Sequence, residues 1–184
     1  MSTLTSTLSR TGTWIIDPSH TAVTFVARHL VVSKVRGRFT SVSGTVEVTD
    51  PVEGSTVDVS IEAASIDTNE EQRDGHLRSP DFLDVETYPA ITFRSTGLRT
   101  VDDQRWALDG ELTIRDVTKP VELDVTYLGT VADPWGNEKA GFAATTEIDR
   151  EDFGITWNQA LEAGGWMIGN AVRIELDVQL VPQA

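Results

Sequence analysis

Apolar and polar residues alternate along most of the chain after Gly12, as expected for β-strands that bury one face and expose the other. The strands predicted from this pattern span residues 14–30 (interrupted at Pro18), 36–48, 56–67, 91–99, 106–114, 121–127, 139–148 and 172–180. Turn-forming pairs such as Asp50-Pro51 and Lys119-Pro120 separate them. The pattern therefore predicts about eight strands that follow one another as a meander.

Eight antiparallel strands with one apolar face close most economically into a barrel, because closure removes the unpaired edges of an open sheet. We therefore predict an all-β fold, an eight-stranded antiparallel up-and-down β-barrel. The inward positions combine large residues with small ones: Phe25, Phe93, Trp106 and Leu108 with Ala27, Ala63, Ser95, Ala143 and Thr145. Small inward residues leave room for a ligand, although a tapered and completely filled core is the alternative. Gly110 falls on the inward parity, where a barrel strand bends.

Two stretches depart from the β pattern. Thr68 and Glu71 fit a capping box, and the polar residues up to Pro80 predict a short helix at about 69–78, at the rim of the barrel. Residues 152–170 alternate little and predict a long cap or mouth segment. The Ser/Thr-rich residues 1–11 predict a flexible tail, which leaves residues 12–184 as a single domain.

Composition narrows the choice of partners. The formal net charge of −14 makes the average surface repel nucleic-acid phosphates and anionic lipid headgroups, so we expect no nucleic-acid partner. The chain has no cysteine, which excludes disulfides, thiolate metal sites and cysteine nucleophiles. The sequence shows neither a basic segment followed by an apolar run at its start nor an apolar run long enough to span a membrane. We therefore expect a cytoplasmic protein with no membrane span.

Four motifs occur in order along the chain: DPSHTAVTFVARHLVVSKVRGRF, SIDTNEEQRDGHLRSPDFLDVETYPAITFRS, LDGELTIRDVTKPVELDV and IDREDFGITWN. Together they resemble the YceI-like polyisoprenoid-binding family from about Trp14 to Leu180. The resemblance implies a lipocalin-like barrel whose apolar tunnel takes a long isoprenoid chain, and it suggests a homodimer. The positions that match the family's motifs are His20, His29, Arg73, Asp74, His76, Leu77, Arg150, Asp152, Phe153 and Gly154.

The polar candidates each allow two interpretations. His20 and His29 are nine residues apart, so a regular strand places them on opposite faces, and we expect no metal site. His29 shares the inward parity and either bonds a neighbour in the core or meets the polar head of a ligand. Arg73, Asp74 and His76 either pair locally and pin the helix to the rim or form a polar gate.

The expected function is the binding, carriage or storage of a long amphiphilic isoprenoid, such as a polyprenyl quinone, its precursor or a polyprenyl phosphate. Apart from such a bound lipid we expect no cofactor. The predicted ligand-binding residues are Val23, Phe25, His29, Phe39, Arg73, His76, Phe82, Phe93, Trp106, Leu108, Leu112, Val125, Phe153, Trp157, Trp166 and Ile174. Trp157 and Trp166 either line the tunnel mouth or hold the cap against the core.

Two other functions remain open. The first is an enzyme that acts on an isoprenoid-like substrate with His29 or His76 as acid or base. The second is a barrel with a filled core that serves protein interaction. The sequence lacks a Gly-x-Ser-x-Gly elbow, and most strand carboxylates fall on the outward parity, so we assign no catalytic residue.

Overall fold

The computed structural model describes Leu8 and residues 10–184, so most of the predicted tail at residues 1–11 lies outside the described residues. In chain order the strands are β1 (Gly12–Ile16), β2 (Ala22–His29), β3 (Ser33–Phe39), β4 (Val42–Val48), β5 (Thr56–Glu62), β6 (Ile66–Asp67), β7 (Ala90–Thr100), β8 (Arg105–Ile114), β9 (Val117–Ala132), β10 (Glu138–Asp149) and β11 (Ile168–Pro182). They form the predicted closed, eight-stranded antiparallel barrel. We call each of the eight positions around the barrel a stave, whether one strand or two strands fill it. Three staves consist of two strands each: β1 with β2, β3 with β4, and β5 with β6.

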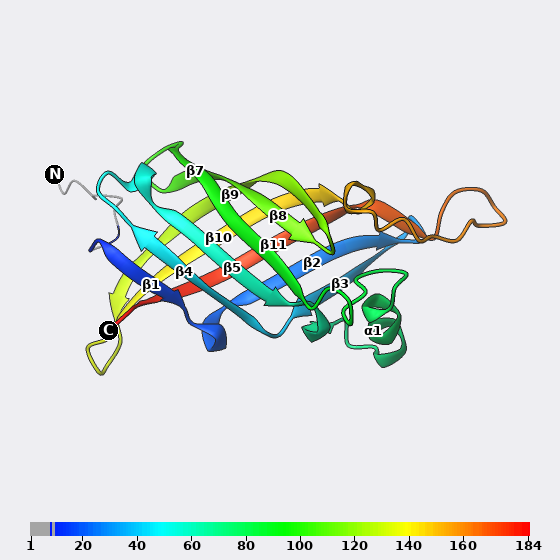
Figure 1. The fold of residues 1–184 in the computed structure, drawn as a ribbon, viewed down its shortest axis with the longest axis horizontal. Helices are drawn as coiled ribbons and strands as arrows, with labels where there is room; N and C mark the ends of the chain where they lie inside the picture. Colours follow the sequence, from blue (N-terminus) through cyan, green and yellow to red (C-terminus); the bar gives the residue numbers. More distant parts are fainter. Residues whose placement is uncertain (1–7, 9) are drawn as a thin grey trace.

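The barrel closes along β11. One side of β11 pairs with β10, and the other side pairs with β1 near its end (Ile16 with Leu180) and with β2 nearer its start (Ala22 with Asp177). Figure 1 shows an elongated barrel with the C-terminus at one end and helix α1 (Glu71–Arg78) at the other. We call these the far end and the helix end. The helix end also carries the turn between β2 and β3 and residues 154–167.

The first stave is interrupted where the sequence predicts it, at Pro18. Residues Pro18–His20 form a single turn of 3-10 helix, η1, with Asp17 at its N-cap. The Asp17 carboxylate accepts hydrogen bonds from the amide and the hydroxyl of Ser19, and it lies 2.9 Å from Nδ1 of His20. The Nε2 atom of Gln179 on β11 also donates to it. Asp17 thus ties the interruption in the first stave to the closing strand.

This arrangement predicts a specific acid sensitivity. The hydrogen bond from the Ser19 hydroxyl, with those of His20 and the Ser19 amide, holds the pKa of Asp17 well below its ordinary value of 3.8. A carboxylate whose pKa is lower in the folded state stabilises the protein at pH values above its unfolded-state pKa. This stabilisation is lost as the pH falls from the unfolded-state pKa towards the folded-state pKa. We expect the free energy of unfolding to decline below about pH 4, and Asp17→Asn to reduce the slope of that decline. Urea unfolding across this range measures it.

The same substitution at Asp103, an exposed carboxylate in the turn between β7 and β8, serves as the control. It should leave the acid slope close to that of the parent protein. An unchanged slope in Asp17→Asn would contradict the role given to Asp17.

Helix α1 forms near the predicted position, but the predicted capping box is wrong. Glu70 is the residue at the N-cap, and its carboxylate accepts from the amides of Gln72 and Arg73. Thr68 is buried and bonds instead to Asp74, which accepts from both the amide and the hydroxyl of Thr68. A local spacing rule identifies the helix correctly but does not foresee that a buried aspartate competes for the threonine.

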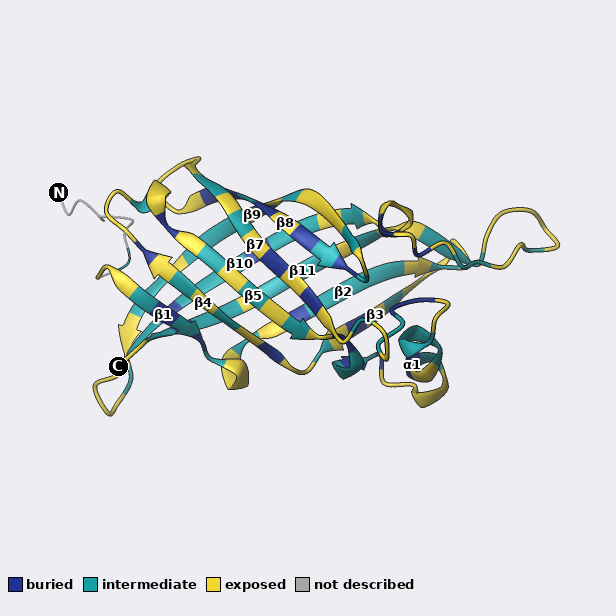
Figure 2. Ribbon diagram, viewed as in Figure 1, coloured by how far each residue is buried: buried dark blue, intermediate teal, exposed yellow. Residues whose placement is uncertain are grey.

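The inward faces of the staves form two connected clusters of apolar side chains. Figure 2 shows the alternation of exposed and less exposed residues along the strands. Two inward glycines make room for large rings: a Cβ atom on Gly37 would lie 2.3 Å from the ring of Phe25, and one on Gly110 would lie 2.3 Å from the ring of Phe93. The strand opposite Gly110 has a register shift between Ser95 and Gly97, so the predicted irregularity appears on the neighbouring strand.

The inward parity predicted for β10 is wrong. Ala144 and Thr146, rather than Ala143 and Thr145, belong to the inner wall, together with Phe142. The residues from 141 to 146 are small or apolar on both parities, so they offer little contrast from which to predict the inner face. A register shift between Gly141 and Phe142 relative to β9 adds to the difference.

Candidate ligand-binding cavity

The barrel encloses a cavity of about 470 Å³. Its wall is almost entirely aliphatic and aromatic, and every stave contributes to it. Val57, Val59 and Ile61 of β5 belong to the wall and alternate with exposed neighbours, yet none of the three is fully buried. Inward residues of β11 such as Ile174 and Leu176 are also incompletely buried. Side chains that point inward and still have accessible surface border an open space, so the core is hollow rather than filled.

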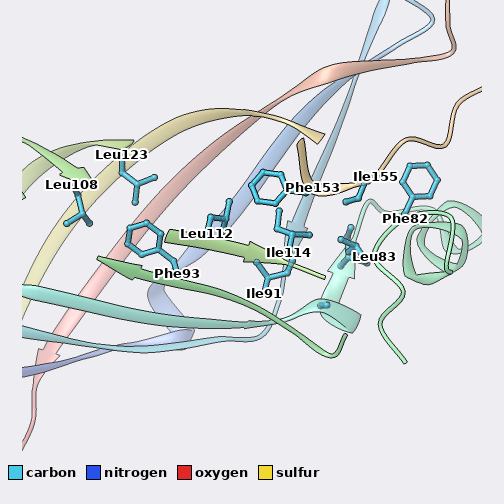
Figure 3. Close-up of a cluster of buried hydrophobic side chains, with 12 residues drawn as sticks. Phe82, Leu83, Ile91, Phe93, Leu108, Leu112, Ile114, Leu123, Phe153 and Ile155 are labelled. Carbon is cyan, nitrogen blue, oxygen red and sulfur yellow. The ribbon is translucent and has the colours of Figure 1, made fainter. Parts of the chain in front are cut away.

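From the middle of the barrel to the helix end, the wall consists of buried apolar side chains. Figure 3 shows these side chains reaching inward from β7, β8 and β9, with Phe153 and Ile155 coming from the segment after β10. Phe153 is 2% exposed, and Phe93, Leu108 and Leu112 are also buried. The aliphatic and aromatic composition means that water inside gains few hydrogen bonds, so the cavity favours an apolar occupant.

At the far end the inward side chains are packed more closely than at the helix end. Trp14 and Ala140 have no exposed surface, and Leu180 packs in the same cluster. The rings of Trp106, Tyr127 and Phe142 contact one another, with centroid separations of 5.3 to 6.2 Å. Leu8 also packs against this cluster. These contacts restrict access from the far end.

The helix end carries the polar part of the wall. Arg28, His29, Arg73, His76 and Arg150 belong to the wall there. Arg28 is exposed and the two histidines are partly exposed, so the cavity reaches the surface between them. Among the described residues, no aspartate or glutamate belongs to the wall. The rim is therefore rich in hydrogen-bond donors and positive charge.

Arg150 is the most deeply buried of these groups, with 5% of its surface exposed. Its guanidinium donates to the carbonyls of Gly169, Ile155 and Trp157 at 2.8 to 3.0 Å, which fastens the segment after β10 to the start of β11. Burial lowers the pKa of Arg150 below its ordinary value, and the nearby acidic residues Glu151 and Asp149 oppose this shift. Within the described part of the chain, Arg150 forms no ion pair with a carboxylate. Its charge is therefore neutralised only partly, by carbonyl dipoles.

Local pairing holds α1 against the rim. Asp74, 6% exposed, accepts from Thr68, while the guanidinium of Arg73 donates to the hydroxyl and the carbonyl of Thr68 at 2.7 and 2.9 Å. This geometry favours the local-pairing interpretation for Arg73 and Asp74. Arg73 nevertheless belongs to the cavity wall, so its pairing also fixes a guanidinium at the mouth.

The two rim histidines have different surroundings. Nε2 of His76 lies 2.8 Å from the carboxylate of Asp81, and its ring packs edge-on against Phe82 and Trp157. His29, in contrast, has no hydrogen-bond partner for its ring among the described residues. An inward ring nitrogen without a protein partner remains available for a ligand.

The wall includes fifteen of the sixteen residues predicted to bind ligand, although their contact with a ligand remains a prediction. Trp166 is the exception: it is 60% exposed and lies outside the wall, in the loop before β11. Trp157 packs on His76 and Phe82 at the mouth. Among the described residues, His, Asp and Glu side chains nowhere gather in a group of three or more that would suit a metal ion.

Sequence patterns alone do not identify Arg28 and Arg150 as rim residues. Arg28 lies on the outward parity of β2, where a period-two rule excludes it from the wall. It reaches the mouth because it stands near the end of the strand. Arg150 matches a family motif, but the motif does not by itself assign it to the site. Its position directly after the end of β10, in the family motif, is the available signal.

Fold and cavity together define a lipocalin-like barrel, a closed antiparallel barrel with a hollow apolar interior. The chain belongs to the YceI-like family, because the model of the YceI-like domain matches residues 14–180. A UPF0312 protein of Vibrio cholerae is 36% identical over 146 residues, which cover 77% of each chain. None of the helices in the described part of the chain is long and apolar enough to cross a membrane.

Two solved structures resemble the barrel. BcnA of Burkholderia cenocepacia aligns with a TM-score of 0.77 at 21% identity, covering 89% of this chain and 98% of BcnA. A domain of Saccharophagus degradans, described as a polyisoprenoid binding domain implicated in plant cell wall breakdown, aligns with a TM-score of 0.69 at 15% identity. The alignment covers 92% of this chain and 98% of that domain. At these identities the two likenesses support the fold.

Proposed function

We propose that this protein binds and carries one long isoprenoid amphiphile, with the prenyl tail inside the barrel and the polar head at the helix end. The observation that carries the proposal is a hollow apolar interior that opens at a rim of arginines and histidines. The volume of about 470 Å³ falls in the range of small-molecule sites. The description of the Saccharophagus degradans domain as polyisoprenoid-binding points to the same class of ligand.

The shape of the cavity suits an extended chain. Wall residues on β11 run from Ile168 to Leu180, which corresponds to roughly 40 Å along the strand and roughly 30 Å along the barrel axis at a usual strand tilt. A volume of about 470 Å³ spread over that length describes a narrow tunnel. Each methylene that leaves water gains about 0.8 kcal/mol, so a tail of several prenyl units gains most from such a tunnel.

The rim indicates what kind of head the ligand has. Arg28, Arg73 and His29 offer donors, and the described wall contains no carboxylate. A head with acceptor oxygens therefore fits, which includes a quinone, a phenolic precursor and a phosphate. A cationic head would meet the guanidinium charges without a compensating carboxylate. The location in the cytoplasm and the homodimer remain predictions.

The test begins with native mass spectrometry and solvent extraction of the purified protein. We expect one prenyl compound per chain. The delipidated protein should then take up prenyl quinones and polyprenyl phosphate in a saturable titration of tryptophan fluorescence, since Trp106 and Trp157 lie in the wall. Uptake should strengthen with prenyl length until the tunnel is filled.

Two outcomes would overturn the proposal. A protein that extracts clean and takes up no prenyl compound would instead serve protein interaction. A ligand whose mass changes during incubation with the protein identifies an enzyme instead. Recovery of the added ligand with its mass unchanged supports binding without turnover.

A further inference from the structure

The turn between β2 and β3 has an unusual composition for a surface turn. Leu30, Val31 and Val32 form it, and the last two are 69% and 86% exposed. Leu30 and Val31 have φ angles of 54° and 64°, in the left-handed region that β-branched and bulky residues avoid. A tight turn facing water ordinarily uses Asn and Gly at such positions. Three apolar residues kept there against solvation, two of them also against backbone preference, indicate a requirement other than folding.

A fourth exposed apolar residue lies in the loop that is joined to this turn. Trp166, in the loop of residues 158–167, is 60% exposed. The amide of Leu30 donates to the carbonyl of Met167 at 2.8 Å, and His29 pairs with Ile168, so turn and loop are joined at their bases. Figure 1 shows the loop projecting from the helix end along the long axis of the barrel. We call Leu30, Val31, Val32 and Trp166 the tip surface.

Positive charge borders the tip surface. Between Pro18 and Val46 the sequence has no aspartate or glutamate, in a chain with a net charge of −14. Arg28 pairs directly across the hairpin with Lys34, and Arg36 follows two residues later on the same face. In the described part of the chain, neither Lys34 nor Arg36 forms a salt bridge. Like charges placed opposite each other repel, unless an anionic partner lies against them.

The far end also has exposed apolar residues, but the charges around them differ from those around the tip surface. Val131 and Trp135 are also exposed there, 66% and 82%. The turn that carries Trp135 contains Asp133, whose carboxylate accepts from the Trp135 amide, and Glu138 and Lys139 follow it. In the 158–167 loop, Glu162 is the single carboxylate, and the β2–β3 hairpin has none. The apolar patch at the helix end therefore has a predominantly basic border, whereas carboxylates and a lysine together border the patch at the far end.

We propose that the tip surface and its basic border dock on an anionic lipid bilayer. Exposed aliphatic residues and a tryptophan insert at the boundary between headgroups and acyl chains, while lysine and arginine contact anionic headgroups. Screening limits electrostatic interactions to about 8 Å at physiological salt, so the acidic charge elsewhere on the barrel does not prevent this contact. The docked orientation points the polar rim of the cavity at the membrane, because His29 belongs to both the hairpin and the wall.

The proposal goes beyond lipid carriage, and its test uses no prenyl ligand. Delipidated protein is sedimented with vesicles of phosphatidylcholine alone and of phosphatidylcholine mixed with phosphatidylglycerol. We expect binding to the mixed vesicles that weakens in high salt, and little binding to phosphatidylcholine alone. Failure here leaves uptake of ligand by the cavity untouched, so the two proposals fail separately.

The decisive variant combines Leu30→Asn, Val31→Gly and Val32→Ser. It gives the turn the residues that its left-handed backbone prefers, so we expect unchanged or higher thermal stability. Vesicle binding should nevertheless fall by about tenfold or more, because the inserted apolar area is lost. Lys34→Gln with Arg36→Gln should also weaken binding and reduce its salt dependence.

The matched control is Val131→Ser with Trp135→Ser at the far end, which removes a similar exposed apolar area and should bind vesicles like the parent protein. Equal loss in this control would overturn the proposal, as would absence of binding to the mixed vesicles. Sedimentation equilibrium without vesicles tests whether a second copy of the chain covers the tip surface instead. If the turn variant converts a dimer to a monomer, the tip surface is an interface between two copies of the chain.

Discussion

Val59→Trp should abolish uptake of prenyl ligands while leaving the barrel folded. Val59 packs against both apolar clusters, which places it midway along the interior, and its side chain still has accessible surface facing the cavity. A tryptophan there occupies the space through which the tail must pass. Filling existing space strains the fold less than inserting atoms into a close-packed core, where the usual cost is about 1–3 kcal/mol. We expect at least tenfold weaker binding, about 1.4 kcal/mol or more.

The adjacent residue provides a matched control. Ser60 lies on the outer face of β5 and is exposed, so Ser60→Trp adds the same side chain without entering the cavity. It should bind prenyl quinone like the parent protein. Thermal unfolding establishes that both variants are folded. Undiminished uptake by a folded Val59→Trp would mean that the tail does not lie in the barrel.

Arg150→Met should destabilise the protein strongly. It leaves the carbonyls of Gly169, Ile155 and Trp157 without their donors in a largely buried environment. Each unsatisfied buried group costs about 1–3 kcal/mol, so we expect a loss of more than about 3 kcal/mol from a total of about 5–15 kcal/mol. Urea unfolding measures it, and hydrogen exchange should show faster exchange in residues 155–169.

Arg173→Met is the control for charge and side-chain length. Arg173 is exposed on β11 and pairs with Glu175, an interaction worth about 1 kcal/mol or less at a surface. A similar denaturation midpoint for the two variants would show that Arg150 does not hold the mouth segment. Weaker ligand binding by Arg150→Met is expected as a secondary effect, because the segment forms part of the cavity wall.

The sequence itself contains a local pattern at the tip surface, which the net charge of the whole chain does not reveal. Leu30-Val31-Val32 interrupts the alternation of the opening strands, and the long stretch without acids surrounds it. Taken over the whole chain, a net charge of −14 predicts repulsion from anionic lipids everywhere. In the structure these three residues are exposed, and Trp166 is exposed in the adjoining loop. The local irregularity in the sequence therefore corresponds to an apolar surface.

The sequence by itself determined the number of staves, their order and most inward positions. Side-chain direction in a strand follows from a period of two, which is a local property, so Phe25, Phe93, Leu112 and Ile174 were assigned correctly to the inner face. Where local contrast was absent, as in residues 141–146, the parity was wrong. Capping at α1 was also wrong, because the buried carboxylate of Asp74 engages Thr68.

The tertiary structure alone decided that the interior is hollow and that it opens at one end. The open volume depends on barrel diameter and stagger, and on which side chains from opposite staves meet, none of which a single strand encodes. The same is true of Arg150, whose three carbonyl partners are set by how the segment after β10 folds back against the start of β11. The alternation of residues along a strand determines which face each side chain points to. The diameter of the closed barrel determines how much space remains between the inward side chains.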